Sequence, residues 1–292
     1  MQSERIVLSV VAHEPVIRMG AFMGIFALMA AWEVISPRRT NVTSKSARWV
    51  NNLALLVLNS VALRVALPVA VTELALHANE QGWGILQQIA LPESLGVLVG
   101  FVLLDLAIYF QHMLFHAVPA LWRVHRVHHA DLDFDVTTGT RFHPIEIFLS
   151  MAIKFAVIMA LGPPALAVLL FEVVLNAAAM FNHANVRVPL PIDRVARWFI
   201  VTPDMHRIHH SVLPHETNSN FGFNLSAWDQ VFGTYRAQPS MGHVGMTIGL
   251  MGYRDPRQVD RLPGMLCLPF INSNDEYTIG RRPRPSVPKT PA

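Results

Sequence analysis

The chain has 292 residues, of which 52% are hydrophobic and only 15% are charged. Because an average soluble protein carries about 25% charged residues, this composition predicts a membrane protein. The single cysteine excludes a disulfide framework, and it excludes an iron–sulfur cluster built on this chain's own thiolates. The formal net charge of +3 is modest, and we expect no nucleic-acid partner.

Four apolar stretches meet or approach the roughly 20 residues that a spanning helix needs, namely 16–35, 50–71, 94–115 and 145–182. The last is too long for one crossing, and Leu-Gly-Pro-Pro at 161–164 interrupts it. Because proline cannot continue a helix, we predict a hairpin of two helices, 145–161 and 164–182. The predicted fold class is all-α: a polytopic membrane bundle of four to five spans, or of single spans plus a hairpin.

Lysine and arginine are unevenly distributed between the segments that connect these stretches. Segment 36–49 holds four, 72–93 holds none, 116–144 holds three, and the chain from 183 onward holds twelve. Because cytosolic loops are rich in these cations, we predict the N-terminus outside and segments 36–49, 116–144 and the C-terminal part inside. The hairpin either crosses the membrane twice or re-enters it from the cytosolic side. Both arrangements leave the flanking segments on the same side of the membrane. The compact size favours a bacterial inner membrane.

Eight of the fourteen histidines fall in three short patterns, one HxxxH and two HxxHH. On a helix, positions i, i+3 and i+4 share one face, so each pattern presents its imidazoles side by side. His143 in RFHPIE and His183 in FNHANV are two further candidates. The candidate metal ligands are His112, His116, His125, His128, His129, His143, His183, His206, His209 and His210.

All ten candidates lie on the predicted cytosolic side, which was assigned from lysine and arginine alone. Imidazole binds iron, copper, zinc and nickel, and ten ligands exceed what one ion can use, so we predict two metal ions. The near absence of cysteine excludes thiolate chemistry, and no HExxH zinc-protease motif occurs. Imidazoles beside a lipid phase favour iron that reacts with dioxygen over zinc that reacts with water.

The order HxxxH, HxxHH and a later HxxHH in a chain with several predicted spans resembles the fatty acid hydroxylase and sterol desaturase superfamily, the membrane-bound histidine-box di-iron oxygenases. The stretches RFHPIE, FNHANV and NSNFGFNLSAWDQVFGTYR support this similarity, which covers about residues 97–236. The resemblance implies two iron ions, a cytosolic helical cap that carries the histidines, and dioxygen as co-substrate. The implied reaction is the hydroxylation or desaturation of a membrane lipid.

Family members often carry an acidic residue before the first histidine pattern, and Asp105 stands seven residues before His112. Because an ionisable residue inside a span is functional by default, we expect Asp105 to accept a hydrogen bond from a ligand imidazole. A role in helix packing is the alternative. Lys154 and Glu172 interrupt the predicted hairpin, where an ion pair and a catalytic role are equally compatible.

No GxGxxG, cysteine cluster or haem motif occurs, so a separate electron donor with its reductase is implied: a ferredoxin, a rubredoxin or a cytochrome of the b5 type. Arg123, Arg126, Arg207 and Arg236 are expected to form a basic face that docks an acidic donor or anionic lipid headgroups. We divide the chain into membrane spans at 1–93, a histidine-box domain at 94–240 and a cytosolic tail at 241–292. The end of this tail is predicted to be disordered.

Lipid hydroxylation is the predicted reaction, on a fatty acyl chain, a sterol or a related lipid, and desaturation by the same site is the alternative. Two non-enzymatic alternatives are a membrane metal transporter and a lipid sensor. A transporter needs ionisable groups along a path through the membrane, whereas these histidines cluster at one end of the spans. All three patterns are intact, which argues against a sensor that has lost catalysis.

Overall fold

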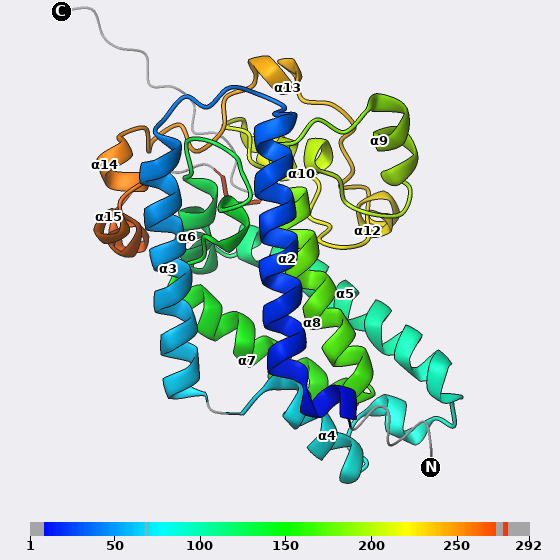
Figure 1. Cartoon of the computed structure of the whole chain (residues 1–292). Coiled ribbons are helices and arrows are strands. Elements are labelled where there is room, and N and C mark those ends of the chain that lie inside the picture. The colour runs from blue at the N-terminus through cyan, green and yellow to red at the C-terminus, as the bar shows by residue number, and fades with distance from the viewer. Residues whose placement is uncertain (1–8, 68, 273–276, 280–292) are drawn as a thin grey trace, which may run out of the picture.

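The computed structural model describes residues 9–67, 69–272 and 277–279. Within these ranges every regular element is a helix, and β structure is limited to isolated bridges. Figure 1 shows a bundle of long helices beneath a cap of short helices and loops. The predicted all-α fold is confirmed.

In the part of the chain that the structure describes, five segments contain helices that are long and apolar enough to cross a membrane. The helices are α2 (Glu14–Ile35), α3 (Lys45–Ala66), α5 (Glu93–Ala117), α7 (Pro144–Leu161) and α8 (Ala165–Asn182). The shortest have 18 residues, which at about 1.5 Å per residue approaches the ~30 Å of a hydrocarbon core. Helix α3 begins five residues before the predicted span 50–71. The reason is that the Ser44 side chain caps α3 by accepting a hydrogen bond from the Ala47 amide.

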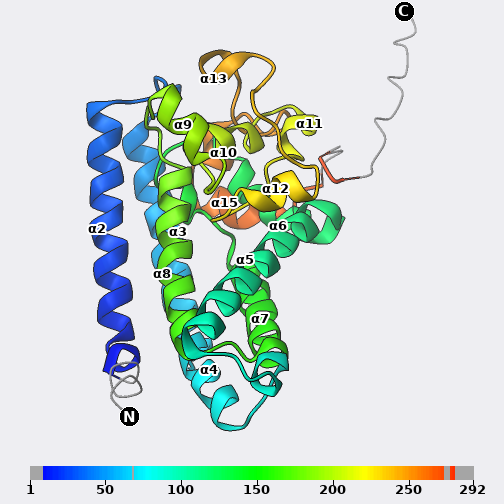
Figure 2. The ribbon, with the colours of Figure 1, turned by 90° about the vertical axis from the view of Figure 1, so that its right-hand side faces the viewer.

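Helix α8 is the central helix of the bundle and packs against both α2 and α5. Half of its apolar stretch is buried, compared with 6% of that of α2. Figure 2 shows α2 at the edge of the bundle. The apolar side chains that α2 leaves exposed, such as Met19, Met23 and Leu28, therefore suit contact with lipid.

The turn between α7 and α8 lies at the end of the bundle away from the cap (Figure 1). Gly162 ends α7 in the left-handed conformation at φ 62°, and a Cβ there would lie 2.0 Å from the Trp83 carbonyl oxygen. Asn79 also holds this turn, since its amide group donates to the Pro163 carbonyl and accepts from the Ala165 amide. The predicted break at 161–164 is confirmed.

Segment 72–93 was predicted only as a connection, but it contains α4 (Val71–Glu80) and the short helix η1 (Ile85–Gln88). Glu73 stabilises the start of α4 by accepting a hydrogen bond from the Ala70 amide at 3.0 Å. Small buried residues, Ala75 and Ala78, allow α4 to pack closely against α7 and α8. This segment therefore closes the end of the bundle opposite the cap.

The cap consists of short elements that the long helices hold in place. They are α6 (Pro119–His129), η2 (Thr138–Thr140), α9 (Leu190–Ala196), α10 (Pro203–His209), α11 (Pro214–Thr217), α12 (Ala227–Val231), α13 (Gly242–Gly245), α14 (Pro256–Val259), α15 (Leu262–Cys267) and η3 (Leu268–Phe270). One apolar cluster joins α3 and α6 to the C-terminal segment through Leu55, Trp122, Leu250 and Met265. The described part of segment 241–292 therefore packs into the cap, whereas the predicted disordered end at 280–292 lies outside the described residues.

A buried ionic network ties the connection between α2 and α3 to the cap. The guanidinium group of Arg48 lies 2.6 Å from carboxylate oxygens of both Asp131 and Asp135. Asp133 accepts hydrogen bonds from the amides of Val42 and Thr43. Although burial raises the pKa of Asp131, the positive charge of Arg48 beside it holds that pKa below its usual value. Arg48, one of the cations from which the sidedness of the loops was predicted, therefore also has a structural role.

Candidate metal centre

Nine of the ten predicted ligands meet where the long helices join the cap. Group A consists of His112, His116, His125, His129 and His209, and group B consists of His128, His183, His206 and His210. In each group, one potential ligand atom per residue lies within 4.8 Å of all the others, and every side chain is buried. Helices α5, α6 and α10 and the end of α8 supply these histidines.

The facing ring nitrogens have the spacing of ligands that share one ion. In group A, Nε2 of His209 lies 3.0 Å from Nε2 of His112, and Nε2 of His129 lies 3.2 Å from Nε2 of His116. In group B, Nε2 of His183 lies 3.1 Å from Nε2 of both His128 and His206. Two imidazoles bound at about 2.1 Å and at right angles place their nitrogens about 3.0 Å apart. The geometry therefore fits a metal ion in each group.

Hydrogen bonds to the opposite ring nitrogen fix the tautomer of several of these histidines. Nδ1 of His112 donates to the Phe221 carbonyl, Nδ1 of His209 to the Ser219 carbonyl, and Nδ1 of His183 to the Ala179 carbonyl, at 2.7–2.8 Å. Because a carbonyl oxygen only accepts, Nδ1 must carry the proton, and Nε2 keeps its lone pair for a metal.

Burial favours the neutral form of six of these imidazoles. It lowers the pKa of His183 to about 4, and it lowers the pKa values of His128, His129, His206, His209 and His210 well below their ordinary value. In these last five, the neighbouring imidazoles lower the pKa further, since two positive rings repel one another. Neutral imidazole is the form that binds metals.

Two predicted site residues lie elsewhere. His143 is in neither group, and it caps α7, where its Nδ1 accepts a hydrogen bond from the Ile145 amide at 3.2 Å. Asp105 accepts hydrogen bonds from the indole of Trp228 at 2.8 Å and from the Leu225 amide at 3.2 Å. Contrary to expectation, Asp105 therefore anchors the 225–228 stretch rather than a ligand imidazole.

One carboxylate that contacts a predicted ligand was not predicted from the sequence. Oε1 of Glu146 lies 2.5 Å from Nδ1 of His125. Glu146 stands within RFHPIE, in the first turn of α7, so the signal was present but was assigned to His143 alone. The carbonyl groups of Ser219 and Phe221 were not predicted either. Asp229 holds their loop by accepting hydrogen bonds from the Phe221 and Gly222 amides.

The expected basic face is incomplete, because two of its four arginines are buried. Arg207 pairs with Asp204, and Arg126 donates to the Leu268 and Ile271 carbonyls. Only Arg123 and Arg236 keep partial exposure. The prediction that all four dock an electron donor or lipid headgroups is therefore wrong.

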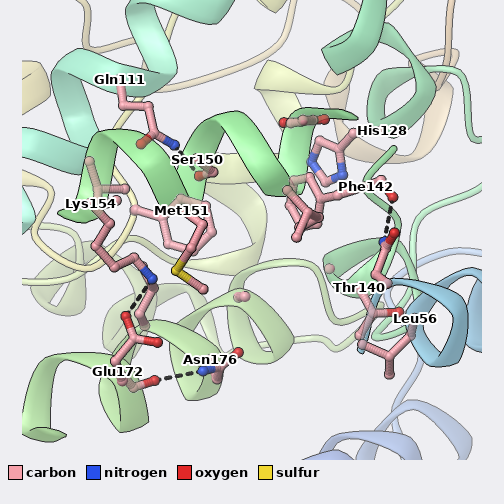
Figure 3. A pocket seen from close by; sticks show the side chains of 18 of the residues that line it. Leu56, Gln111, His128, Thr140, Phe142, Ser150, Met151, Lys154, Glu172 and Asn176 are labelled. Atoms are coloured by element: carbon pink, nitrogen blue, oxygen red, sulfur yellow. Dashed lines mark hydrogen bonds and ion pairs between the residues drawn. The ribbon is translucent and has the colours of Figure 1, made fainter. Parts of the chain in front are cut away.

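A cavity of about 320 Å³ extends from the histidines into the space between the long helices. His112, His125 and His128 line it together with apolar side chains of four long helices, among them Phe22, Leu63, Met151 and Leu175. Lys154 and Glu172 lie at the left of Figure 3 and His128 lies at the right. Nζ of Lys154 is 2.5 Å from Oε1 of Glu172. Of the two alternatives for Lys154 and Glu172, the ion pair is therefore present, and Arg18 also pairs with Glu172, at 3.0 Å.

Fold and site together define a helical membrane-type protein with two buried groups of potential metal ligands. Residues 97–234, just under half of the chain, match the model of the fatty acid hydroxylase family. The resemblance that the histidine patterns predict is thus confirmed.

Several curated relatives are lipid hydroxylases or monooxygenases. The ornithine lipid hydroxylase OlsE of Rhizobium tropici is 26% identical over 273 residues, which cover 90% of this chain and 78% of the relative. The alkylglycerol monooxygenase of Xenopus tropicalis is 27% identical over 50% of this chain and 32% of its own length. Cholesterol 25-hydroxylase of Homo sapiens is 27% identical over 48% of this chain and 51% of its own length. No solved structure matches the chain.

Proposed function

We propose that the chain is an integral-membrane, dioxygen-dependent lipid hydroxylase with one iron ion in group A and a second in group B. The observation that carries this proposal is the pair of buried imidazole groups beside a cavity that reaches between the long helices. Ligands that are all imidazoles suit iron, and their facing nitrogens already have the spacing of shared ligands.

The overall reaction is R–H + O2 + 2 electrons + 2 protons → R–OH + H2O. When bound, the irons supply the redox chemistry that activates dioxygen and the C–H bond. The residues of this chain position the proposed metal ligands. Glu146 orients His125, and the ring of Phe142 stacks on that of His128 with the two ring centroids 4.5 Å apart. The apolar cavity lining binds hydrocarbon and excludes water.

The names of the relatives favour hydroxylation over desaturation, and ornithine lipid is our first choice of substrate to test. We further propose that a separate ferredoxin, rubredoxin or cytochrome b5-type protein, with its reductase, supplies the electrons. In this proposal the protein lies in a bacterial inner membrane, and its histidine end faces the cytosol. Residues 94–240 form the catalytic unit, and segment 1–93 supplies the remaining spans.

Iron stoichiometry tests the proposal. We expect two iron ions per purified wild-type chain by mass spectrometry of the metals. His209→Ala in group A and His206→Ala in group B should each lower the iron content towards one. His215→Ala is the matched control, because His215 is exposed and lies in neither group. Zinc in place of iron, or two ions retained in both group variants, would contradict the proposal.

A further inference from the structure

Among the described residues, three side-chain acceptor oxygen atoms of the cavity lining have no hydrogen-bond partner: Oε1 of the partly buried Gln111 and two atoms of buried residues. The two on buried residues carry the argument. They are Oδ1 of Asn59 on α3 and Oε2 of Glu146 on α7. The two residues are only 4% and 5% exposed, and both line the cavity that His112, His125 and His128 line. Buried polar atoms in folded proteins almost always have partners, so these two atoms point to a ligand.

The contacts of both side chains fix these atoms as acceptors. Nδ2 of Asn59 donates to the Phe142 carbonyl at 2.8 Å, and a flipped amide would place oxygen against oxygen. The other oxygen of Glu146 already holds His125. Both residues therefore lie at the histidine end of the cavity, since the Phe142 ring stacks on His128.

The amine, guanidinium and amide donors elsewhere in the cavity already have partners within the protein. Lys154 and Arg18 pair with Glu172, and Nε2 of Gln111 donates to the Ser150 hydroxyl at 2.6 Å, as Figure 3 shows for Lys154 and Gln111. The amide of Asn176 donates to the Glu172 carbonyl. No donor among the described residues is bonded to Asn59 Oδ1 or Glu146 Oε2, so a ligand that carries a donor fits this end of the cavity.

We propose that the substrate lipid presents a hydrogen-bond donor, N–H or O–H, to Asn59 and Glu146. The carbon that faces the histidines then lies in or next to the polar part of the lipid, whereas a plain hydrocarbon segment would leave both acceptors unpaired. This inference rests on the proposed function and narrows its substrate class to lipids that carry an amine, amide or hydroxyl group beside the oxidised carbon.

Binding to the metal-free full-length protein in detergent tests the inference with three radiolabelled probes of equal chain length. They are 1-aminohexadecane, 1-hexadecanol and the donor-free 1-methoxyhexadecane. We expect at least one donor-bearing probe to bind about threefold to tenfold more tightly than the ether, the contribution of one hydrogen bond. A preference for the amine that Glu146→Gln removes would identify an ammonium group, and a preference for the alcohol that persists in this variant would identify a hydroxyl group.

Asn59→Leu should abolish the preference over the ether, while Leu58→Ala, next to it on the exposed face of α3, should leave the preference unchanged. Equal binding of all three probes to the wild-type protein, which needs no variant to fold, would overturn the inference. So would a full preference retained by folded Asn59→Leu. Because the binding assay needs neither metal nor turnover, a failure of the proposed oxygenation would show separately, as absent lipid oxidation in cells.

Discussion

At the scale of single residues, the contact between Glu146 and His125 decides how firmly group A holds a metal. We expect Glu146→Gln to lower the affinity for ferrous iron by about 10–100-fold, because the neutral amide is a weaker acceptor for the Nδ1 proton of His125. Competition with a chromophoric chelator measures this affinity.

Glu80→Gln is the control for this variant, because Glu80 is exposed at the end of the bundle opposite the cap. If both variants keep the wild-type affinity, Glu146 does not support a metal ligand.

The sequence was informative about the ligands and uninformative about their supports. Histidine patterns at helical spacing identified eight of the nine residues that the structure brings together, because i, i+3 and i+4 positions share a face whatever the tertiary structure is. The ninth, His183, came from the FNHANV stretch. Asp105 was assigned to an imidazole from its position on α5, yet its partner is Trp228, 123 positions away. Contacts at such a separation depend on how the cap folds back, which local spacing does not encode.

At the scale of elements, Arg48 joins α3 to the loop at 131–135. Arg48→Met should lower the free energy of unfolding by about 3–5 kcal/mol, because the buried carboxylates of Asp131 and Asp135 lose the cation that compensates them. Thermal unfolding in detergent is the measurement.

Arg64→Met, on the same helix but exposed, should unfold within about 0.5 kcal/mol of the wild-type protein. Equal stability of the two variants would show that the buried network contributes little.

The turn between α7 and α8 offers a second test at this scale. Gly162→Ala should cost at least about 1–2 kcal/mol, because alanine is strained at φ 62° and its Cβ would collide with the Trp83 carbonyl. Gly20→Ala on α2 should be neutral or stabilising, because a Cβ there meets nothing within 4 Å. Chemical denaturation of both variants compares them, and an unchanged midpoint for Gly162→Ala would refute the packing described at this turn.

Apolar runs and one proline pair predicted the long helices to within a few residues, because length and composition determine such helices. Helix α4 was not predicted, because its ten residues carry both charged and apolar side chains and gain their stability from packing on α7 and α8.

At the scale of the whole molecule, the single cysteine reports which side of the membrane the cap faces. Cys267 on α15 is exposed and lies in the cap. The proposed orientation predicts that a membrane-impermeant maleimide labels Cys267 in inverted vesicles but not in intact spheroplasts. A Cys267→Ser, Glu80→Cys double variant should show the reverse pattern, and labelling of Cys267 in spheroplasts would contradict the orientation.

The central claim is that this chain inserts an oxygen atom from dioxygen into a membrane lipid. The most direct measurement is lipid mass spectrometry of cells grown under ¹⁸O2 that express either the wild-type protein or a His128→Ala, His209→Ala double variant at equal abundance. The account predicts a lipid that carries one ¹⁸O atom in the wild-type cells alone. Wild-type protein that contains iron, is supplied with a competent electron donor and leaves every lipid unlabelled would contradict it.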